Sequence, residues 1–247
     1  MAILKLQEVL DEIGTIKALE DAMLAAKQHG VSWDKGINAV FSVISKNTAL
    51  APTNVKNSKD GKISAIEKWV VKYHKGFCGR VSQRVSNPPG TLADPIIDSI
   101  IGARLSHLTD DDLNKISFAH RLSMSSENIL GLFLEEYLAR NLSKSGWHCA
   151  WGETVKSVDF VKENGELLQI KNRSNSENSS SVRVRDGTSI KKWYRIEASR
   201  IEYKWDLLNE MCGIDALSED GFVDFVHTII KANPKALTIE HGNPWKG

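Results

Sequence analysis

The order of elements expected between residues 126 and 171 constrains the fold of this 247-residue chain more than any other feature. Residues 126–146 carry apolar side chains at helical spacing and end in Gly146, a residue type that commonly stops helices. Three short segments with strand character follow, and the last two flank Asn164-Gly165, a strong signal for a hairpin turn. The sequence therefore predicts one helix followed by three strands.

Most of the remaining chain has a helical pattern. Apolar residues, Ile16 and Met23 among them, recur at three- or four-residue spacing in residues 6–23, 37–44 and 66–73, and further helices are expected to start at Asp94-Pro95 and within residues 109–112. The polar residues 46–62 are expected to form an exposed loop or hinge, and the tail beyond residue 205 to be mostly helical. We expect a helical N-terminal region over residues 1–85 and a second region over residues 86–247.

The composition, 41% hydrophobic and 26% charged, is that of a soluble globular protein with a full core, in one large domain or two small ones. No apolar run approaches the roughly 20 residues of a membrane span, and the first 14 residues include acids that a signal peptide would lack. We therefore expect a cytoplasmic protein without a membrane partner. Cys78, Cys149 and Cys212 lack metal-ligand spacing, so we expect reduced core residues and no zinc site.

The two strands around Asn164-Gly165 carry the residues with the clearest chemical potential. Asp159 lies at the end of one strand and Lys171 at the end of the next, with Gln169 two positions earlier. Residues two apart on a strand point to the same face, so Gln169 and Lys171 are expected to point together. Hydrolysis of a phosphodiester needs oxygen ligands for a divalent metal and a cation or base beside the attacking water. This set of side chains is typical of such a site.

Whether Asp159 joins the other two depends on the turn. A two-residue loop would pair Asp159 with Ile170 and direct the aspartate to the wrong face, because a one-residue slip reverses every side chain. A three-residue loop over residues 163–165, with Gly165 in the left-handed conformation, would pair Asp159 with Gln169. We predict the three-residue loop.

These residues resemble a known signature. Asp159 followed by Gln169-x-Lys171 resembles the PD-(D/E)XK nuclease motif, with valine in place of the proline and glutamine in place of the second acid. Gly131-Leu-Phe-Leu-Glu135 and the later Gly146 fit the helix that precedes the first strand in that core. Residues 120–138 and 169–195 are, in addition, similar to the SinI-type restriction endonucleases, in a resemblance that covers roughly residues 90–205.

The resemblance implies an α/β (α+β) fold, in which residues 86–247 form a PD-(D/E)XK restriction-endonuclease-like core with a central mixed sheet flanked by helices. It implies a type II restriction endonuclease that cuts double-stranded DNA at a short palindromic site with Mg²⁺. The site residues would be Asp159 as principal metal ligand, Gln169 and the Ile170 carbonyl completing the coordination, Glu135 orienting a metal-bound water, and Lys171 holding or deprotonating the attacking water. A neutral amide is a poorer ligand than a carboxylate, so Gln169 leaves the number of metals open.

The segment that follows the motif is basic although the whole chain carries a net charge of only +1. Between residues 171 and 204 there are nine basic and four acidic residues, so we expect residues 172–205 to recognise DNA. The candidates for DNA contacts are Lys191, Lys192 and Arg195 toward phosphates, Arg183 and Arg185 toward guanine edges, and Arg173 without an assigned partner. A palindromic site implies a homodimer, with the N-terminal helices as a candidate dimer or DNA-wrapping surface, and a cognate DNA methyltransferase as functional partner.

Two other functions fit the same residues. A DNA repair nuclease or junction resolvase would share the core, and its substrate would be branched or mismatched DNA. A non-catalytic DNA-binding protein would keep the fold without the chemistry, and Gln169 is the one residue that favours it. A histidine-based nuclease is disfavoured because the seven histidines show no paired spacing.

Overall fold

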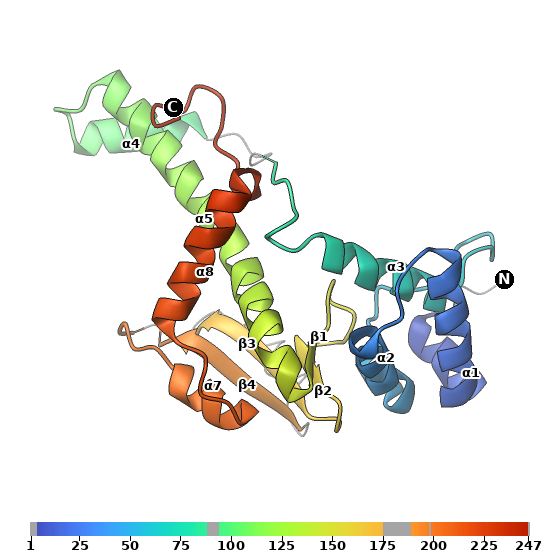
Figure 1. Cartoon of the computed structure of the whole chain (residues 1–247). Coiled ribbons are helices and arrows are strands. Elements are labelled where there is room, and N and C mark those ends of the chain that lie inside the picture. The colour runs from blue at the N-terminus through green and yellow to red at the C-terminus, as the bar shows by residue number, and fades with distance from the viewer. Residues whose placement is uncertain (1–3, 88–93, 175–188, 198, 247) are drawn as a thin grey trace.

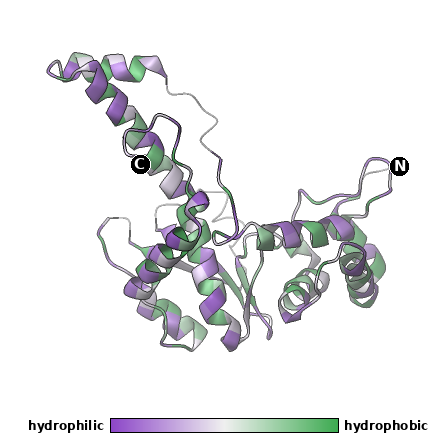
Figure 2. Ribbon diagram, turned by 45° about the horizontal axis from the view of Figure 1, so that its top comes forward, coloured by the Kyte–Doolittle hydropathy of each residue, from purple (hydrophilic) through white to green (hydrophobic). Residues whose placement is uncertain are grey.

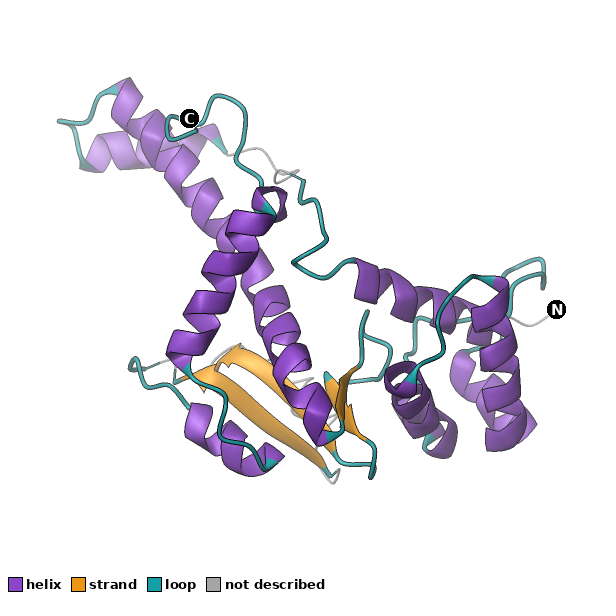
Figure 3. Cartoon of the chain, in the orientation of Figure 1, coloured by secondary structure: helices purple, strands orange, loops and turns teal. Residues whose placement is uncertain are grey.

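A computed structural model describes residues 4–87, 94–174, 189–197 and 199–246. A group of N-terminal helices lies beside a small sheet, and a long helix crosses the sheet and extends well beyond it (Figures 1 and 3). The helices are α1 (Leu6–Gln28), α2 (Lys35–Lys46), α3 (Ala65–Cys78), α4 (Pro95–Arg104), α5 (Asp110–Leu142), α7 (Trp205–Cys212) and α8 (Glu219–Ala232), with 3-10 turns at Thr48–Leu50, Ser143–Ser145 and Pro234–Ala236. The strands are β1 (Trp147–Cys149), β2 (Phe160–Lys162), β3 (Leu167–Arg173) and β4 (Ile190–Ile196).

The sheet is mixed, as the resemblance implied. Its strand order is β1-β2-β3-β4, with antiparallel pairing of β1 with β2 and of β2 with β3, and parallel pairing of β3 with β4. The sequence pattern did not identify β4, because Lys191 and Lys192 interrupt its apolar alternation. Trp193 nevertheless packs in the core against Trp205 of α7, with ring centroids 5.1 Å apart.

The turn between β2 and β3 is the predicted three-residue loop. Lys162 and Glu166 pair across it, with the Lys162 N–H donating to the Glu166 carbonyl at 2.9 Å. Gly165 has φ +92°, in the left-handed region that glycine enters without a steric penalty. This loop fixes the register in which Phe160 faces Leu168 and Val161 faces Leu167.

Helix α5 is one continuous helix of 33 residues where the sequence suggested two. Its start was predicted: Thr109 accepts the Asp112 N–H, and the Asp112 side chain accepts the Thr109 N–H. No proline or cap separates this start from the expected second helix, so the hydrogen-bonded backbone continues through residue 126. The buried residues of α5 all lie at or beyond Ile129, and its first half extends away from the sheet together with α4 (Figure 1).

Helix α1 contains a break that the sequence reading missed. Gly14 has φ +74°, which interrupts the helix and changes the angular phase of the residues after it. Ile16 is consequently 79% exposed and Met23 is also exposed, although their spacing predicted a buried face. Alanines of the same helix are buried instead, at positions 18, 22, 25 and 26. The prediction of a fully exposed loop over residues 46–62 is also wrong in part, because Leu50 and Val55 are buried.

The N-terminal helices pack directly against the first strand and the turn after it. The Trp69 indole N–H of α3 donates to the Thr154 carbonyl at 2.8 Å, and α3 approaches residues 151–152 so closely that a Cβ on Gly76 would lie 2.3 Å from the Gly152 nitrogen. The contact at Gly76 therefore joins the N-terminal helices to the edge of the sheet.

Polar and apolar residues alternate along these helices (Figure 2). Within the described residues, no helix combines the length and apolarity that crossing a membrane requires.

We expect Gly76→Ala to lower the free energy of unfolding by about 1–3 kcal/mol, the usual range for overpacking a close contact, because the new methyl group must push α3 away from the Gly152 backbone. Urea unfolding followed by circular dichroism measures the change. The control is Gly131→Ala in α5, where a Cβ meets open space, and its stability should stay the same or rise by up to about 1 kcal/mol. Equal stability of the two variants would contradict the close packing of α3.

Candidate active site

Asp159 immediately precedes β2 and is tied to both neighbouring strands. Its N–H donates to the Leu168 carbonyl at 3.0 Å, and its own carbonyl accepts the Ala150 N–H at 2.8 Å. Its carboxylate accepts the Ile170 N–H at 2.7 Å. The expected pairing of Asp159 with Gln169 is not formed, since the regular ladder ends at Phe160 and Leu168. Asp159 instead bonds to the two neighbours of Gln169 in β3, to Leu168 through its backbone N–H and to Ile170 through its carboxylate.

Glu135 of α5 and Asp159 line the same cavity, whose volume is about 310 Å³. Burial raises the pKa of Glu135 to about 7, and the negative charge of Asp159 adds to this effect. Burial likewise raises the pKa of Asp159 to about 6, while the Ile170 N–H opposes the increase. The resemblance to the nuclease core pointed to both residues, and the structure brings them together in one low-dielectric space.

Lys171 supplies the positive charge next to these carboxylates. Its ammonium lowers the pKa of both Glu135 and Asp159, which requires it to lie near both groups. Because residues 167–171 continue as one regular strand, Gln169 projects from the same face of β3 as Lys171. The structure thus joins Asp159, Glu135 and Lys171 in one electrostatic cluster.

Glu153 belongs to this cluster although the sequence reading did not select it. It lines the cavity beside Asp159 and raises the pKa of both Glu135 and Asp159. Its φ of +54° places it in the left-handed region, which is uncommon for a residue other than glycine. The turn that carries it follows β1, and the sequence alone contained no motif that linked it to Asp159.

Gln169 and Ile170 occupy the middle of β3, and neither lines the cavity. Gln169 is 5% exposed, and Ile170 is also buried. The Ile170 N–H is held by Asp159. The neutral amide of Gln169 therefore adds no further negative charge beside Glu135 and Asp159.

The cluster fits a hard divalent cation in its chemistry. Carboxylate oxygens are the ligands that Mg²⁺ prefers, and Glu135 has no hydrogen-bond partner among the described residues. Within the same residues, no three acidic, histidine or cysteine side chains converge closely enough to form a complete metal-binding group. Mg²⁺ commonly uses one or two carboxylates and takes its other ligands from water and substrate phosphates. Asp159 and Glu135, which both line the cavity, are therefore the residues that would hold such a cation.

The structure separates the residues proposed to contact DNA. Arg195 is 6% exposed, donates from Nε to the Asn172 side chain at 3.0 Å and forms an ion pair with Glu219. This placement corrects its assignment as a phosphate contact, because a buried, paired guanidinium holds β4 against α8 and is not presented to DNA. Arg183 and Arg185 lie outside the described residues.

The other basic candidates remain accessible. Lys191 pairs with Glu166, and this hydrogen bond is the main reason why the pKa of Glu166 falls to about 2. The Lys192 ammonium lies 6.0 Å from the centre of the Tyr194 ring, and Arg173 is exposed at the end of β3. These three side chains therefore differ from Arg195 in being exposed or partly exposed.

Comparison with known proteins agrees with this architecture. The sequence profile described as SinI restriction endonuclease matches residues 19–232. The type II restriction enzyme SinI of Salmonella infantis is 33% identical over 225 residues, which cover 86% of this chain and 96% of that enzyme. The type II restriction enzyme Eco47I of Escherichia coli is 41% identical over 174 residues, which cover 68% of this chain and 74% of that enzyme.

A mixed sheet flanked by helices, with a buried carboxylate cluster beside a lysine, is consistent with these matches, and together they define a site-specific endonuclease of the type II restriction class. The match to the family profile extends over most of the chain. The chain belongs to the SinI restriction endonuclease family.

We expect Glu135→Gln to stabilise the metal-free protein at pH 8 but not at pH 4. The pKa of Glu135 is raised in the folded state from 4.5 to about 7, so folding favours the protonated carboxyl. The stability that Glu135 contributes is therefore fully present below pH 4.5, is lost as the pH rises toward 7, and does not change further above that. Removing the charge should restore about 1–3 kcal/mol at pH 8.

Urea unfolding in EDTA between pH 4 and pH 8 measures this difference. Glu127→Gln is the matched control, because Glu127 is exposed on the same helix and should give a curve parallel to that of the wild type. A Glu135→Gln difference that does not change with pH would show that Glu135 is not buried beside the other carboxylates.

Proposed function

We propose that this endonuclease is Mg²⁺-dependent and that it cuts double-stranded DNA at a short palindromic site, with its chemistry centred on Asp159 and Lys171. The observation that carries the proposal is that Asp159 and Glu135 line one cavity and that the charge of Lys171 lowers the pKa of both carboxyl groups. Buried like charges raise each other's pKa, and such an arrangement is typical of sites that bind a cation or handle protons.

In the proposed mechanism each side chain has a separate task. Asp159 is the principal metal ligand, and the Ile170 N–H fixes the orientation of its carboxylate. Glu135 orients a water molecule from the helix side of the cavity, and Lys171 holds the attacking water from the strand side. When bound, the cation supplies Lewis-acid stabilisation of the negative charge that develops on the phosphate oxygens.

Gln169 and the Ile170 carbonyl are proposed to complete the coordination, as the family signature implies. Glu153 provides at the cavity a carboxylate that Gln169 lacks. A substitution of glutamine for the second acid of the motif is therefore compatible with catalysis.

We further propose that the enzyme acts as a homodimer, with one cavity for each DNA strand, and that a cognate DNA methyltransferase is its functional partner. A two-fold symmetric protein matches a palindromic site, because each half-site meets the same surface. Arg173, Lys191 and Lys192 are the phosphate contacts proposed within the segment 172–205, and Arg183 and Arg185 the base contacts. Residues 1–85 are proposed to extend the surface that surrounds the DNA.

We expect Lys171→Ala to abolish cutting of plasmid DNA in Mg²⁺ while leaving DNA binding intact. The wild type should give discrete fragments with Mg²⁺ and none with EDTA, and the variant should give a retarded but uncut band in a mobility-shift assay. Loss of one group that assists the attacking water typically lowers the rate of cutting by about 10²- to 10⁴-fold.

The matched control is Lys144→Ala, which removes an exposed lysine that does not line the carboxylate cavity and should cut like the wild type. Cutting by Lys171→Ala at the wild-type rate would overturn the assignment of the site. Tight binding without cutting by the wild type would favour a non-catalytic DNA-binding protein, and cutting confined to branched or mismatched DNA would favour a repair nuclease or junction resolvase.

A further inference from the structure

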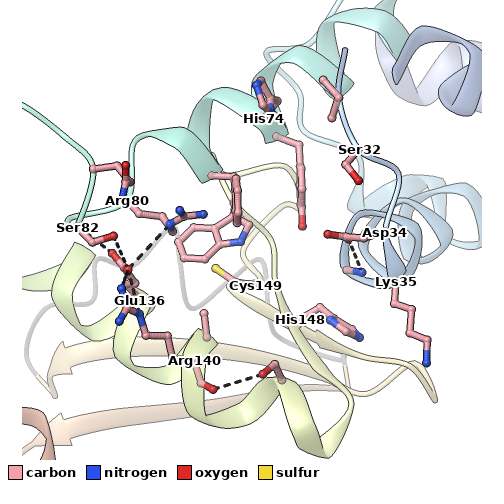
Figure 4. Close-up of a pocket in the computed structure, with 18 of the residues that line it drawn as sticks. Ser32, Asp34, Lys35, His74, Arg80, Ser82, Glu136, Arg140, His148 and Cys149 are labelled. Atoms are coloured by element: carbon pink, nitrogen blue, oxygen red, sulfur yellow. Dashed lines mark hydrogen bonds and ion pairs between the residues drawn. The ribbon is translucent and has the colours of Figure 1, made fainter. Parts of the chain in front are cut away.

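A second, larger cavity lies beside the carboxylate cavity. Its volume is about 750 Å³, and its walls come from α2, α3, the segment after α3, α5 and β1 (Figure 4). Arg80, Cys149 and Trp151 line both cavities. The two cavities therefore adjoin each other at these three residues.

The larger cavity is suited to a negatively charged ligand. Five basic or titratable nitrogen side chains line it, namely Lys35, His74, Arg80, Arg140 and His148. Its two acids already have internal partners. Asp34 accepts the N–H groups of Gly36 and Ile37 at 2.8 and 3.0 Å as the cap of α2.

Glu136, the second acid, is buried and fully occupied by neighbouring donors. It accepts the Ser82 N–H at 2.9 Å, the Ser82 hydroxyl at 2.6 Å, and two bonds from the Arg140 guanidinium (Figure 4). These bonds lower the pKa of Glu136 even though its burial acts in the opposite direction. Its negative charge is thus balanced within the wall of the cavity and does not repel an incoming anion.

Arg80 stands where the two cavities meet, just after the last turn of α3. Its guanidinium lies 3.6 Å from the centre of the Phe77 ring, and its Nε lies 3.9 Å from the Glu136 carboxylate. These two contacts fix the direction of the side chain. The guanidinium makes no hydrogen bond to any residue that the structure describes, nor an ion pair there with Glu135 or Asp159. A pre-oriented arginine with unused donors is the preferred partner of a phosphate.

We propose that Arg80 binds the DNA phosphate next to the one that is cleaved, while the strand leading to it lies in the larger cavity. This assignment rests on the proposed function, because it takes Asp159 and Lys171 as the centre of cleavage. Arg80 would be a positioning residue contributed by the N-terminal helical region, outside the sequence motif. It holds the backbone so that the neighbouring phosphodiester faces the carboxylates.

The test uses the full-length enzyme and a duplex oligonucleotide that carries the cleavage site mapped with the wild type. Arg80→Ala should lower kcat/KM by on the order of 10- to 100-fold, because a hydrogen bond between charged groups is lost. Lys75→Ala removes a nearby cation, on the last turn of α3, that lines neither cavity, and it should leave kcat/KM unchanged. Equal cutting by Arg80→Ala and the wild type would overturn the proposal.

Two further measurements separate a phosphate contact from a structural role. In the uncut background of Lys171→Ala, adding Arg80→Ala should make the slope of log binding constant against log salt shallower by about one, the value for one lost phosphate contact. A neutral methylphosphonate placed beside the cleaved position should slow the wild type and bring it level with Arg80→Ala. If Arg80→Ala cuts the methylphosphonate DNA more slowly than the wild type does, by the same factor as on normal DNA, Arg80 does not contact that phosphate.

Arg80→Lys covers the case in which Arg80→Ala is unstable, as judged by its thermal midpoint. It keeps the charge without the planar fork, so it should cut at a rate between those of the wild type and Arg80→Ala and retain the wild-type salt slope. A wild-type salt slope for Arg80→Ala together with reduced stability would assign Arg80 to structure alone. Failure of the wild type to cut would refute the proposed function. The salt slope of DNA binding would still show whether Arg80 contacts a phosphate.

Discussion

The hydrogen bond from the Ile170 N–H to the Asp159 carboxylate is the contact on which the site depends. At 2.7 Å it fixes a carboxylate that lies just outside the regular ladder between β2 and β3. The three-residue turn makes this bond geometrically available, because it sets the register that brings Asp159 alongside residues 168–170. A different turn would move Asp159 along β3 and separate it from Glu135.

Around that bond the protein accumulates negative charge at one cavity. Glu135, Glu153 and Asp159 line one cavity, and burial raises the pKa of Glu135 and of Asp159. Burial is the main reason why both pKa values remain above their ordinary range, and the charge of Lys171 lowers them only in part. Functional sites often keep such unfavourable electrostatics, since the groups that relieve them arrive with the substrate or the cation. The buried but neutral Gln169 limits how far this repulsion extends.

Helix α5 connects this cavity to the larger one through two consecutive residues. Successive residues of a helix are about 100° apart around its axis, so Glu135 faces the carboxylate cavity while Glu136 faces its neighbour. Glu136 holds Ser82 and Arg140 in place, and the close contact between Gly76 and Gly152 holds α3 against the sheet edge. The position of Arg80 follows from these two constraints. The N-terminal helices thereby become part of the wall around the site rather than a separate attachment.

The sequence by itself determined the local elements and much of the site. The hairpin at Gly165, the stop at Gly146, the start of α5 and the pair of Asp159 and Lys171 all followed from short-range chemistry and from the resemblance to a nuclease core. Tertiary structure decided the rest. It selected which face of α1 is buried after the break at Gly14, and it placed Glu153 and Arg80 in the wall of the carboxylate cavity. It also buried Arg195 in an ion pair with Glu219, where the sequence had suggested a surface position. The physical reason is that burial and charge pairing depend on neighbours distant in the chain, and no local pattern records those neighbours.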